Sequence, residues 1–312
     1  MLACLFPGQG AQSAGFLHRL PAHRVVKDTI DQASAALSID VLSLDTADAL
    51  RSSVAVQIGL VVAGVASARR LAADGFDIAL CAGLSVGAYA AAVICGAIAF
   101  EDALALVKKR AELMEAAYPR GYGLAAIDGL TEHEVEVLAA DLARDCAIRV
   151  YVGNVNAPRQ IVVAGSDEAL EAFGARALAA GAHRAKRLDV SVPSHCELLA
   201  AQSAELSSYA TGIAFHAPRA LYIGNRRARA LRAPEAIRED LATNMRYTVR
   251  WFDALTSIVE LGATVLVEAP PGQVLTSIAQ FTFPDVPALS ACATPDERLI
   301  AILRKRLARN LQ

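Results

Sequence analysis

Apolar segments near the start of the chain predict the elements of a layered α/β fold. Leu2–Phe6 and Ile78–Ala82 are short and apolar without alternation, which is typical of strands buried in a parallel sheet. Longer apolar stretches at Val54–Ala73 and Tyr89–Ala99 predict buried helices that pack on this sheet. A helix over Phe100–Ala117 is amphipathic, because its charged side chains recur on the turns opposite the apolar stripe.

The middle of the chain has shorter elements with stronger turn signals. Thr131 and Glu134 have the spacing of a capping box, so a helix should begin there. The predicted elements are, in order, a strand at Leu124–Asp128, a helix from Glu132 to about Arg144, strands at Arg149–Asn154 and Gln160–Ala164, a helix from Ser166 to Ala180 and a strand at Arg184–Asp189. This β-α-β-β-α-β order is that of a ferredoxin-like unit.

Longer α/β elements return after Val192-Pro193 and include a strand at Thr264–Glu268. We therefore predict two domains. Residues 1–120 and 190–312 form one discontinuous α/β domain, and residues 121–189 form a small ferredoxin-like subdomain inserted into it.

Composition narrows the possible functions. Hydrophobic residues make up 54% of the chain and charged residues 20%, which excludes a disordered protein. The net charge of −2 provides no positive field to attract a nucleic-acid backbone, and only 5% of the residues are aromatic and could stack on bases. Both numbers argue against a nucleic-acid-binding protein. The six cysteines are scattered without a C-x-x-C pair, which indicates buried thiols in a reducing compartment and neither a disulfide framework nor a zinc site.

One segment, Ala79–Phe100, is uncharged and long enough to cross a bilayer. It contains a glycine-rich turn and has acidic flanks, where a membrane helix would usually have basic ones. We interpret it as a buried strand, a sharp turn and a buried helix. The N-terminus has no signal-peptide pattern, so we expect a soluble cytoplasmic protein with no membrane partner.

The strongest chemical motif is Gly83-Leu84-Ser85-Val86-Gly87, a G-x-S-x-G between a predicted strand and a predicted helix. In such a nucleophile elbow the flanking glycines allow a turn too tight for a Cβ, and the serine lies at a helix N-terminus. The motif predicts an α/β-hydrolase-like large domain with Ser85 as nucleophile. The alternative is a glycine-rich helix start without chemistry.

A serine nucleophile needs a base, and His195 is the best candidate among six histidines. Ser194 and Glu197 have capping-box spacing, which predicts His195 in the first turn of a helix. There the helix dipole would disfavour the imidazolium and keep the ring neutral. A half-buried structural histidine is the alternative.

The loop Phe6–Gln12 follows the first strand and is rich in glycine. Such loops present backbone N–H groups that can hold a phosphate or an oxyanion. The loop lacks the ending of a P-loop and is not G-x-G-x-x-G, so alone it is a weak signal.

Taken together, the motifs resemble one family along nearly the whole chain. They are Phe6–Gly10, the Ser85 turn, Lys109–Met114, Asn154–Gln160, Pro193–Cys196 and Val267–Gly272, and they occur in the order seen in malonyl-CoA:acyl-carrier-protein transacylases. Two further stretches, Ala116–Gly123 and Arg238–Asn244, most resemble the epsilon subunit of bacterial malonate decarboxylase.

The resemblance implies roles for the catalytic residues. Ser85 would be acylated, and His195 would act as its base and later as an acid. The backbone carbonyl of Asn244 would orient His195, which explains why no obvious acidic residue completes a triad. The backbone N–H groups of Gln9 and Val86 would form the oxyanion hole.

The resemblance also implies the substrate contacts. Arg110 would pair with the free carboxylate of the malonyl group, although its position beside two lysines is otherwise typical of a solvated charge. Three more residues match family positions near the acyl pocket: Gln57, Asn156 and Gln160. Leu84 and Ala88 depart from the family, which usually has His and Glu there.

The expected reaction is ping-pong transfer of malonyl from malonyl-CoA to the phosphopantetheine thiol of an acyl carrier protein. No bound metal or redox cofactor is implied. In the decarboxylase setting the acceptor would be that complex's own carrier subunit, with the decarboxylase subunits as further partners. The alternatives are the transacylase of fatty-acid or polyketide synthesis, a serine thioesterase or hydrolase with the same elbow, and a silent scaffold that docks the carrier protein.

Overall fold

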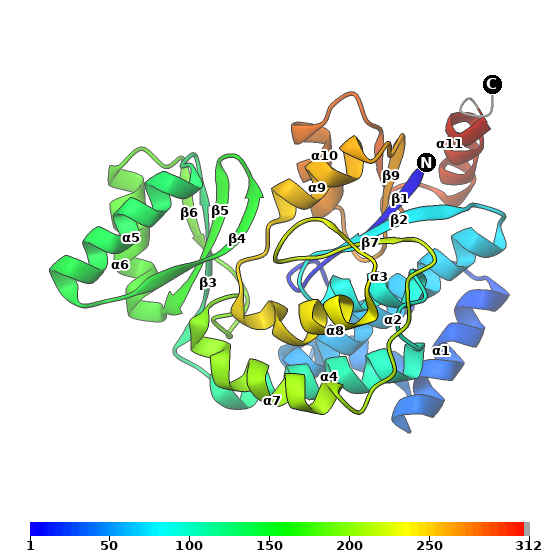
Figure 1. The fold of residues 1–312 in the computed structure, drawn as a ribbon, viewed down its shortest axis with the longest axis horizontal. Helices are drawn as coiled ribbons and strands as arrows, with labels where there is room; N and C mark the ends of the chain where they lie inside the picture. Colours follow the sequence, from blue (N-terminus) through cyan, green and yellow to red (C-terminus); the bar gives the residue numbers. More distant parts are fainter. Residues whose placement is uncertain (309–312) are drawn as a thin grey trace.

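The computed structural model describes residues 1–308 as two separate sheets with helices around them (Figure 1). The larger sheet has the strand order β10-β9-β1-β2-β7-β8. Its strands are parallel except β8, which pairs with β7 as a hairpin. The strands are β1 (Leu2–Phe6), β2 (Ile78–Gly83), β7 (Leu221–Ile223), β8 (Ala230–Leu231), β9 (Val265–Glu268) and β10 (Ala288–Ser290).

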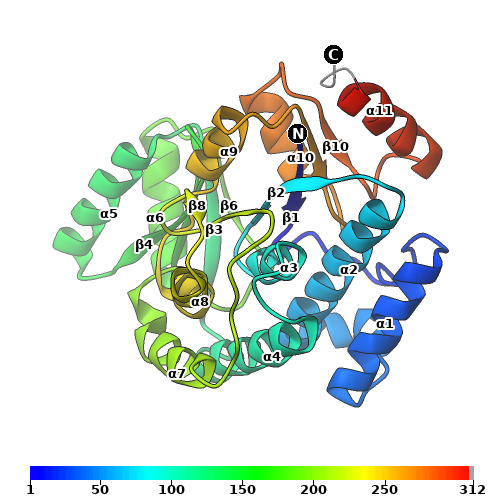
Figure 2. The same ribbon diagram turned by 45° about the vertical axis from the view of Figure 1, so that its right-hand side comes forward.

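Alternate side chains of β1 pack into two different hydrophobic cores, one on each face of the large sheet, so both faces are covered. Leu2, Cys4 and Phe6 face the core formed with α2, α3 and α4, whereas Ala3 and Leu5 face the core formed with α9 and α10. Figure 2 shows α3 beside α2 and α4, in the layer of helices that covers the first of these two faces. The helices are α1 (Arg24–Leu37), α2 (Ser53–Ala73), α3 (Gly87–Ile94), α4 (Phe100–Ala117), α7 (Ala200–Ala210), α8 (Pro234–Thr243), α9 (Trp251–Glu260), α10 (Val274–Thr282) and α11 (Asp296–Ala308).

The smaller sheet is antiparallel, with the order β4-β5-β3-β6 and its own apolar core. Figure 1 shows helices α5 and α6 covering this sheet at one end of the molecule. Its elements are β3 (Tyr122–Asp128), α5 (Glu132–Cys146), β4 (Val150–Ala157), β5 (Gln160–Ser166), α6 (Asp167–Ala179) and β6 (Arg184–Arg187). The predicted capping box of Thr131 and Glu134 is formed. The ferredoxin-like topology is confirmed, whereas the domain limits at residues 120 and 190 stay a prediction.

The uncharged segment 79–100 consists of β2, a tight turn and α3, as predicted. The helix expected to reach Ala99 ends earlier, at Ile94, because Gly96 turns the chain with a φ of 77°. Another helix, α2, is long and apolar enough to cross a membrane. However, 83% of its most apolar stretch is buried inside the protein, as in a core helix.

Candidate active site

The turn between β2 and α3 presents Ser85 on a left-handed backbone, with a φ of 54°. For a residue with a side chain this conformation costs roughly 1–2 kcal/mol, so the surrounding structure must impose it. A Cβ on Gly83 would lie 2.0 Å from the carbonyl carbon of Gly87, as the elbow prediction requires. A Cβ on Gly87 would instead meet the carbonyl oxygen of Phe6 at 2.2 Å, so this glycine lets α3 approach the end of β1.

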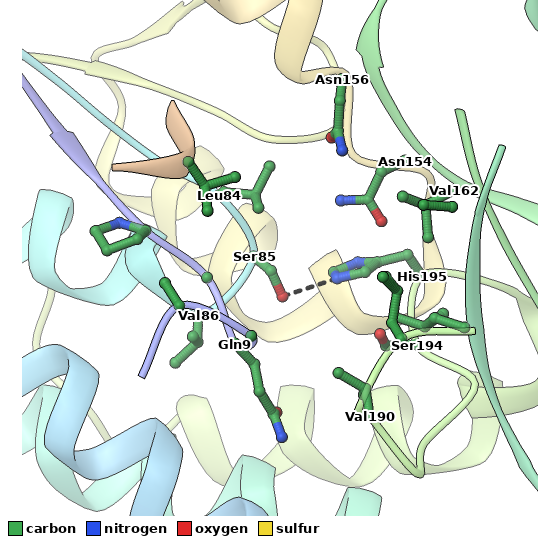
Figure 3. Close-up of a pocket in the computed structure, with 18 of the residues that line it drawn as sticks. Gln9, Leu84, Ser85, Val86, Asn154, Asn156, Val162, Val190, Ser194 and His195 are labelled. Carbon is green, nitrogen blue, oxygen red and sulfur yellow. Dashed lines mark hydrogen bonds between the residues drawn. The ribbon is translucent and has the colours of Figure 1, made fainter. Parts of the chain in front are cut away.

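Ser85 and His195 face each other across the pocket (Figure 3), and the Nε2 atom of His195 lies 2.7 Å from the Ser85 hydroxyl oxygen. The Nδ1 atom of His195 lies 2.7 Å from the backbone carbonyl oxygen of Asn244. Because a carbonyl only accepts, Nδ1 carries the proton and Nε2 has the lone pair that accepts from the serine hydroxyl. The arrangement is that of a nucleophile and its oriented base.

Burial lowers the pKa of His195 to about 4, and the nearby Arg110 cation acts in the same direction. The ring is therefore neutral at pH 7, as expected, but for a different reason. His195 does not lie in a helix: its φ is 69°, and the next helical turn begins at Glu197 without a side-chain cap. The predicted capping box of Ser194 and Glu197 is wrong, and burial replaces the helix dipole as the cause.

Arg110 extends from α4 into the site and is only 1% exposed, which overturns the alternative of a solvated charge. Its guanidinium donates to the Gln57 side-chain oxygen, lies 3.1 Å from the Ser85 hydroxyl oxygen and 3.4 Å from the Asn244 side-chain oxygen. No acidic side chain within residues 1–308 pairs with it. Since a buried cation is strongly stabilised by an anion, the site is suited to a carboxylate.

The two predicted oxyanion-hole residues border the same cavity. Gln9 lies in the loop after β1, and Val86 is the N-cap residue of α3. Within the part of the chain that the structure describes, neither backbone N–H donates a hydrogen bond. Both donors are thus free for an oxygen that develops negative charge near Ser85.

The cavity has a volume of about 430 Å³ and draws its walls from both sheets. Asn156 and Gln160 line it from the smaller sheet. The side-chain oxygen of Asn156 is buried and has no hydrogen-bond partner among residues 1–308, whereas Gln160 donates to Asp128. Gln57 reaches the site through its contact with Arg110. Apolar side chains form much of the wall: Leu84, Val86, Met114, Leu124, Val162 and Val190.

Comparison with known proteins identifies the family. Residues 4–311 match the acyl transferase domain family. The chain belongs to this family. It is 37% identical to the malonyl CoA-acyl carrier protein transacylase of Salmonella typhimurium over 284 residues, which cover 89% of this chain and 91% of the relative. The Haemophilus influenzae protein of the same name is 34% identical over 295 residues, covering 92% and 94%.

Solved structures agree with this acyl transferase over its whole fold. A malonyl CoA-acyl carrier protein transacylase from Coxiella burnetii has a TM-score of 0.92 at 32% identity, covering 98% of this chain and 97% of that one. A malonyl-transacylase solved in complex with a type II PKS acyl-carrier protein has a TM-score of 0.90 at 34% identity, covering 97% and 99%. The large α/β domain and the small domain are thus those of malonyltransferase structures.

Three residues of the site in this acyl transferase were not predicted from the sequence. Asn154 lines the cavity beside His195 (Figure 3), and its place in the Asn154–Gln160 motif was an available signal. Asn225 accepts a hydrogen bond from the backbone of Ser85, and buried Asp240 binds the backbone of Asn225. Asn225 lies two residues after the end of β7, a short apolar strand whose carboxyl end meets that of β2 in a parallel sheet.

The two departures from the family pattern lie in different surroundings. Leu84 lines the cavity and makes its wall more apolar. Ala88 is fully buried in the core behind the elbow and does not line the cavity. Only the Leu84 departure therefore changes the surface that a substrate would meet.

Proposed function

We propose that this acyl transferase moves a malonyl group from malonyl-CoA to the phosphopantetheine thiol of an acyl carrier protein, through an ester on Ser85. The observation that carries the proposal is the buried guanidinium of Arg110, 3.1 Å from the Ser85 hydroxyl oxygen. It matches the single feature that distinguishes malonyl from acetyl, a terminal carboxylate. The names of the relatives support the same substrate.

In the first half-reaction the Ser85 oxygen attacks the thioester carbonyl while His195 Nε2 takes the hydroxyl proton. The resulting oxyanion would accept hydrogen bonds from the backbone N–H groups of Gln9 and Val86. The C–S bond then breaks, His195 returns the proton to sulfur, and CoA leaves. The carbonyl of Asn244 stabilises the imidazolium that forms between these steps.

In the second half-reaction the phosphopantetheine thiol of the carrier protein replaces CoA. His195 takes the thiol proton, and sulfur attacks the malonyl ester. The tetrahedral intermediate collapses with loss of the Ser85 oxygen, which regains the proton from His195. The pantetheine arm belongs to the acceptor, so this chain itself needs no bound cofactor for the reaction.

A narrower assignment is the epsilon subunit of malonate decarboxylase, with that complex's carrier and decarboxylase subunits as partners. The stretches Ala116–Gly123 and Arg238–Asn244 are in its favour. The relatives, however, are named malonyl CoA-acyl carrier protein transacylases, which favours the general transacylase reaction. The two assignments differ in the carrier protein that accepts malonyl. Transfer rates to a fatty-acid carrier and to a decarboxylase carrier, measured side by side, would decide between them.

The acceptor assay also separates a transferase from a hydrolase. Isolated malonyl-enzyme should discharge onto a holo carrier protein much faster than onto water, and an apo carrier without the thiol should accept nothing. Hydrolysis that dominates at saturating holo carrier would favour a thioesterase. Failure to form any acyl-enzyme would favour a silent docking scaffold.

A further inference from the structure

Asn225 contacts the elbow on both sides of Ser85 from the neighbouring strand. Its side-chain oxygen accepts the backbone N–H of Ser85 at 2.9 Å, and its side-chain NH₂ donates to the carbonyl oxygen of Gly83 at 2.9 Å. Asn225 is itself only 4% exposed. One amide side chain therefore pairs a backbone donor and a backbone acceptor of the sharp turn at Ser85.

The strand register brings these residues together although they are 140 positions apart. Strands β2 and β7 are parallel neighbours, with Ala82 opposite Ile223. Two residues beyond this pair along β7 lies Asn225, and three beyond it along β2 lies Ser85. The carboxyl ends of parallel strands meet at one sheet edge, so Asn225 lies where it can reach the turn.

A buried carboxylate fixes Asn225 in turn. The two oxygens of Asp240 on α8 accept the backbone N–H of Asn225 at 3.0 and 3.1 Å. Asp240 also accepts the Tyr222 hydroxyl at 2.7 Å and is 7% exposed. The backbone carbonyl of Asn225 accepts from Arg250 at 3.0 Å, so the amide side chain has little freedom to move.

We propose that Asn225, held by Asp240, is a positioning residue that keeps the Ser85 backbone left-handed and its hydroxyl in line with His195. This rests on Ser85 being the nucleophile of the proposed function. Ser85 occupies a conformation that a residue with a side chain resists, and it persists only when neighbours impose it. Because Asn225 occupies the Ser85 amide, that amide is not available to an oxyanion, whereas the Val86 and Gln9 amides donate no hydrogen bond within residues 1–308.

The test measures the reactivity of Ser85 with a fluorophosphonate, which needs neither malonyl nor CoA. The serine oxygen bonds to phosphorus, fluoride leaves, and His195 takes the hydroxyl proton. Asn225→Ala should react roughly 10- to 100-fold more slowly than the wild type, because two buried backbone groups lose their partner and the elbow relaxes. Reaction rates are compared at a temperature where circular dichroism shows both proteins fully folded.

Asp45→Ala is the matched control for a general loss of stability. Asp45 is 1% exposed and accepts the backbone N–H of Leu17 at 2.7 Å, and neither residue lines the cavity. It should lower the Tm as Asn225→Ala does and still react at the wild-type rate. A folded Asn225→Ala protein that also reacts at the wild-type rate would overturn the proposal.

Asn225→Asp keeps the shape of the side chain and provides a second test should the alanine variant fail to fold. An ionised carboxylate can accept from Ser85 but cannot donate to Gly83, whereas a protonated one can do both. The ratio of variant to wild-type rates should therefore rise as the pH falls. Keeping the pH well above the His195 pKa of about 4 limits the contribution of imidazole protonation to this ratio. A ratio that is low and independent of pH would contradict the proposed donor contact.

The experiment separates this inference from the proposed function. Normal fluorophosphonate labelling of the wild type without any malonyl adduct would reject malonyl transfer and leave the role of Asn225 open to the same comparison. Malonylation of the wild type together with undiminished labelling of Asn225→Ala would reject only the positioning role.

Discussion

His195 accepts from Ser85 through Nε2 only while its ring is neutral, so its environment sets the pH range of the reaction. In the free enzyme, burial and the nearby Arg110 cation lower the pKa of His195 to about 4. The kcat/KM for acylation should be flat near neutrality and fall as the pH drops through about 4. A malonyl carboxylate on Arg110 would offset the cation, so the corresponding fall in kcat should lie at higher pH.

Removing the base tests the same residue directly. His195→Ala should slow acylation by about 10²–10⁴-fold, the usual contribution of a general base. Its residual rate should have lost the fall near pH 4. Unchanged single-turnover acylation in this variant would mean that another group takes the proton.

We expect Arg110 to determine the preference for malonyl-CoA over acetyl-CoA. Charge-assisted bonds to a carboxylate contribute about 1.5–3 kcal/mol, so Arg110→Ala should lower kcat/KM for malonyl-CoA by roughly 10- to 150-fold or more. Acetyl-CoA has no such carboxylate, and its rate should hold or rise. Arg110→Lys should restore part of the loss, because an ammonium lacks the planar pair of donors.

Lys109→Ala is the control for Arg110, since this neighbouring cation pairs with Glu205 on the surface at 2.6 Å. It should leave the malonyl-to-acetyl ratio of kcat/KM unchanged. An equal fall for both substrates in Arg110→Ala would assign Arg110 to structural support and remove its part in selection.

At the scale of elements, the elbow depends on the contact between β2 and α3. Gly83→Ala would place a Cβ 2.0 Å from a backbone atom of Gly87, a distance that requires the helix to move. We expect the Tm to fall by more than about 5 °C and Ser85 labelling to be lost, as overpacking of a rigid core is destabilising.

Gly174→Ala is the control for Gly83→Ala, because it adds the same methyl group at a glycine where there is room for it. Gly174 lies within α6, and an added Cβ would meet Ala185 at an ordinary 3.5 Å. Because alanine favours a helix by up to about 1 kcal/mol over glycine, the Tm should rise by about 1–4 °C with activity unchanged. Equal effects of the two substitutions on the Tm would contradict the crowding at the elbow.

Elements with strong local signals were predictable from the sequence. The predicted limits of β1 at Leu2–Phe6 and of α4 at Phe100–Ala117 are those observed, because an apolar run and an amphipathic period are properties of the segment itself. The capping box predicted at Thr131 forms in the structure, whereas the same residue spacing at Ser194 does not produce one. At Ser194 the backbone of His195 instead bonds to Met245, a distant residue that a local pattern does not reveal.

At the scale of the whole molecule, the site is formed by segments that are far apart in the sequence and come together in the fold. The turn after β2 of the larger sheet contributes Ser85, helix α4 contributes Arg110, and the smaller sheet contributes Asn156. Ser85 and His195 could be singled out from their local motifs, and Arg110 from the resemblance to a family. Asn225 could not, since its contact with Ser85 depends on the order of β2 and β7 in the sheet, which only the fold determines.

The most direct measurement of the central claim is mass spectrometry of the enzyme after brief incubation with malonyl-CoA. The wild type should carry one malonyl group, located on the peptide that contains Ser85, and Ser85→Ala should carry none while remaining folded. The variant removes a single hydroxyl, so its thermal unfolding should stay close to that of the wild type. A malonyl adduct of equal yield on Ser85→Ala, or on another peptide of the wild type, would contradict the account.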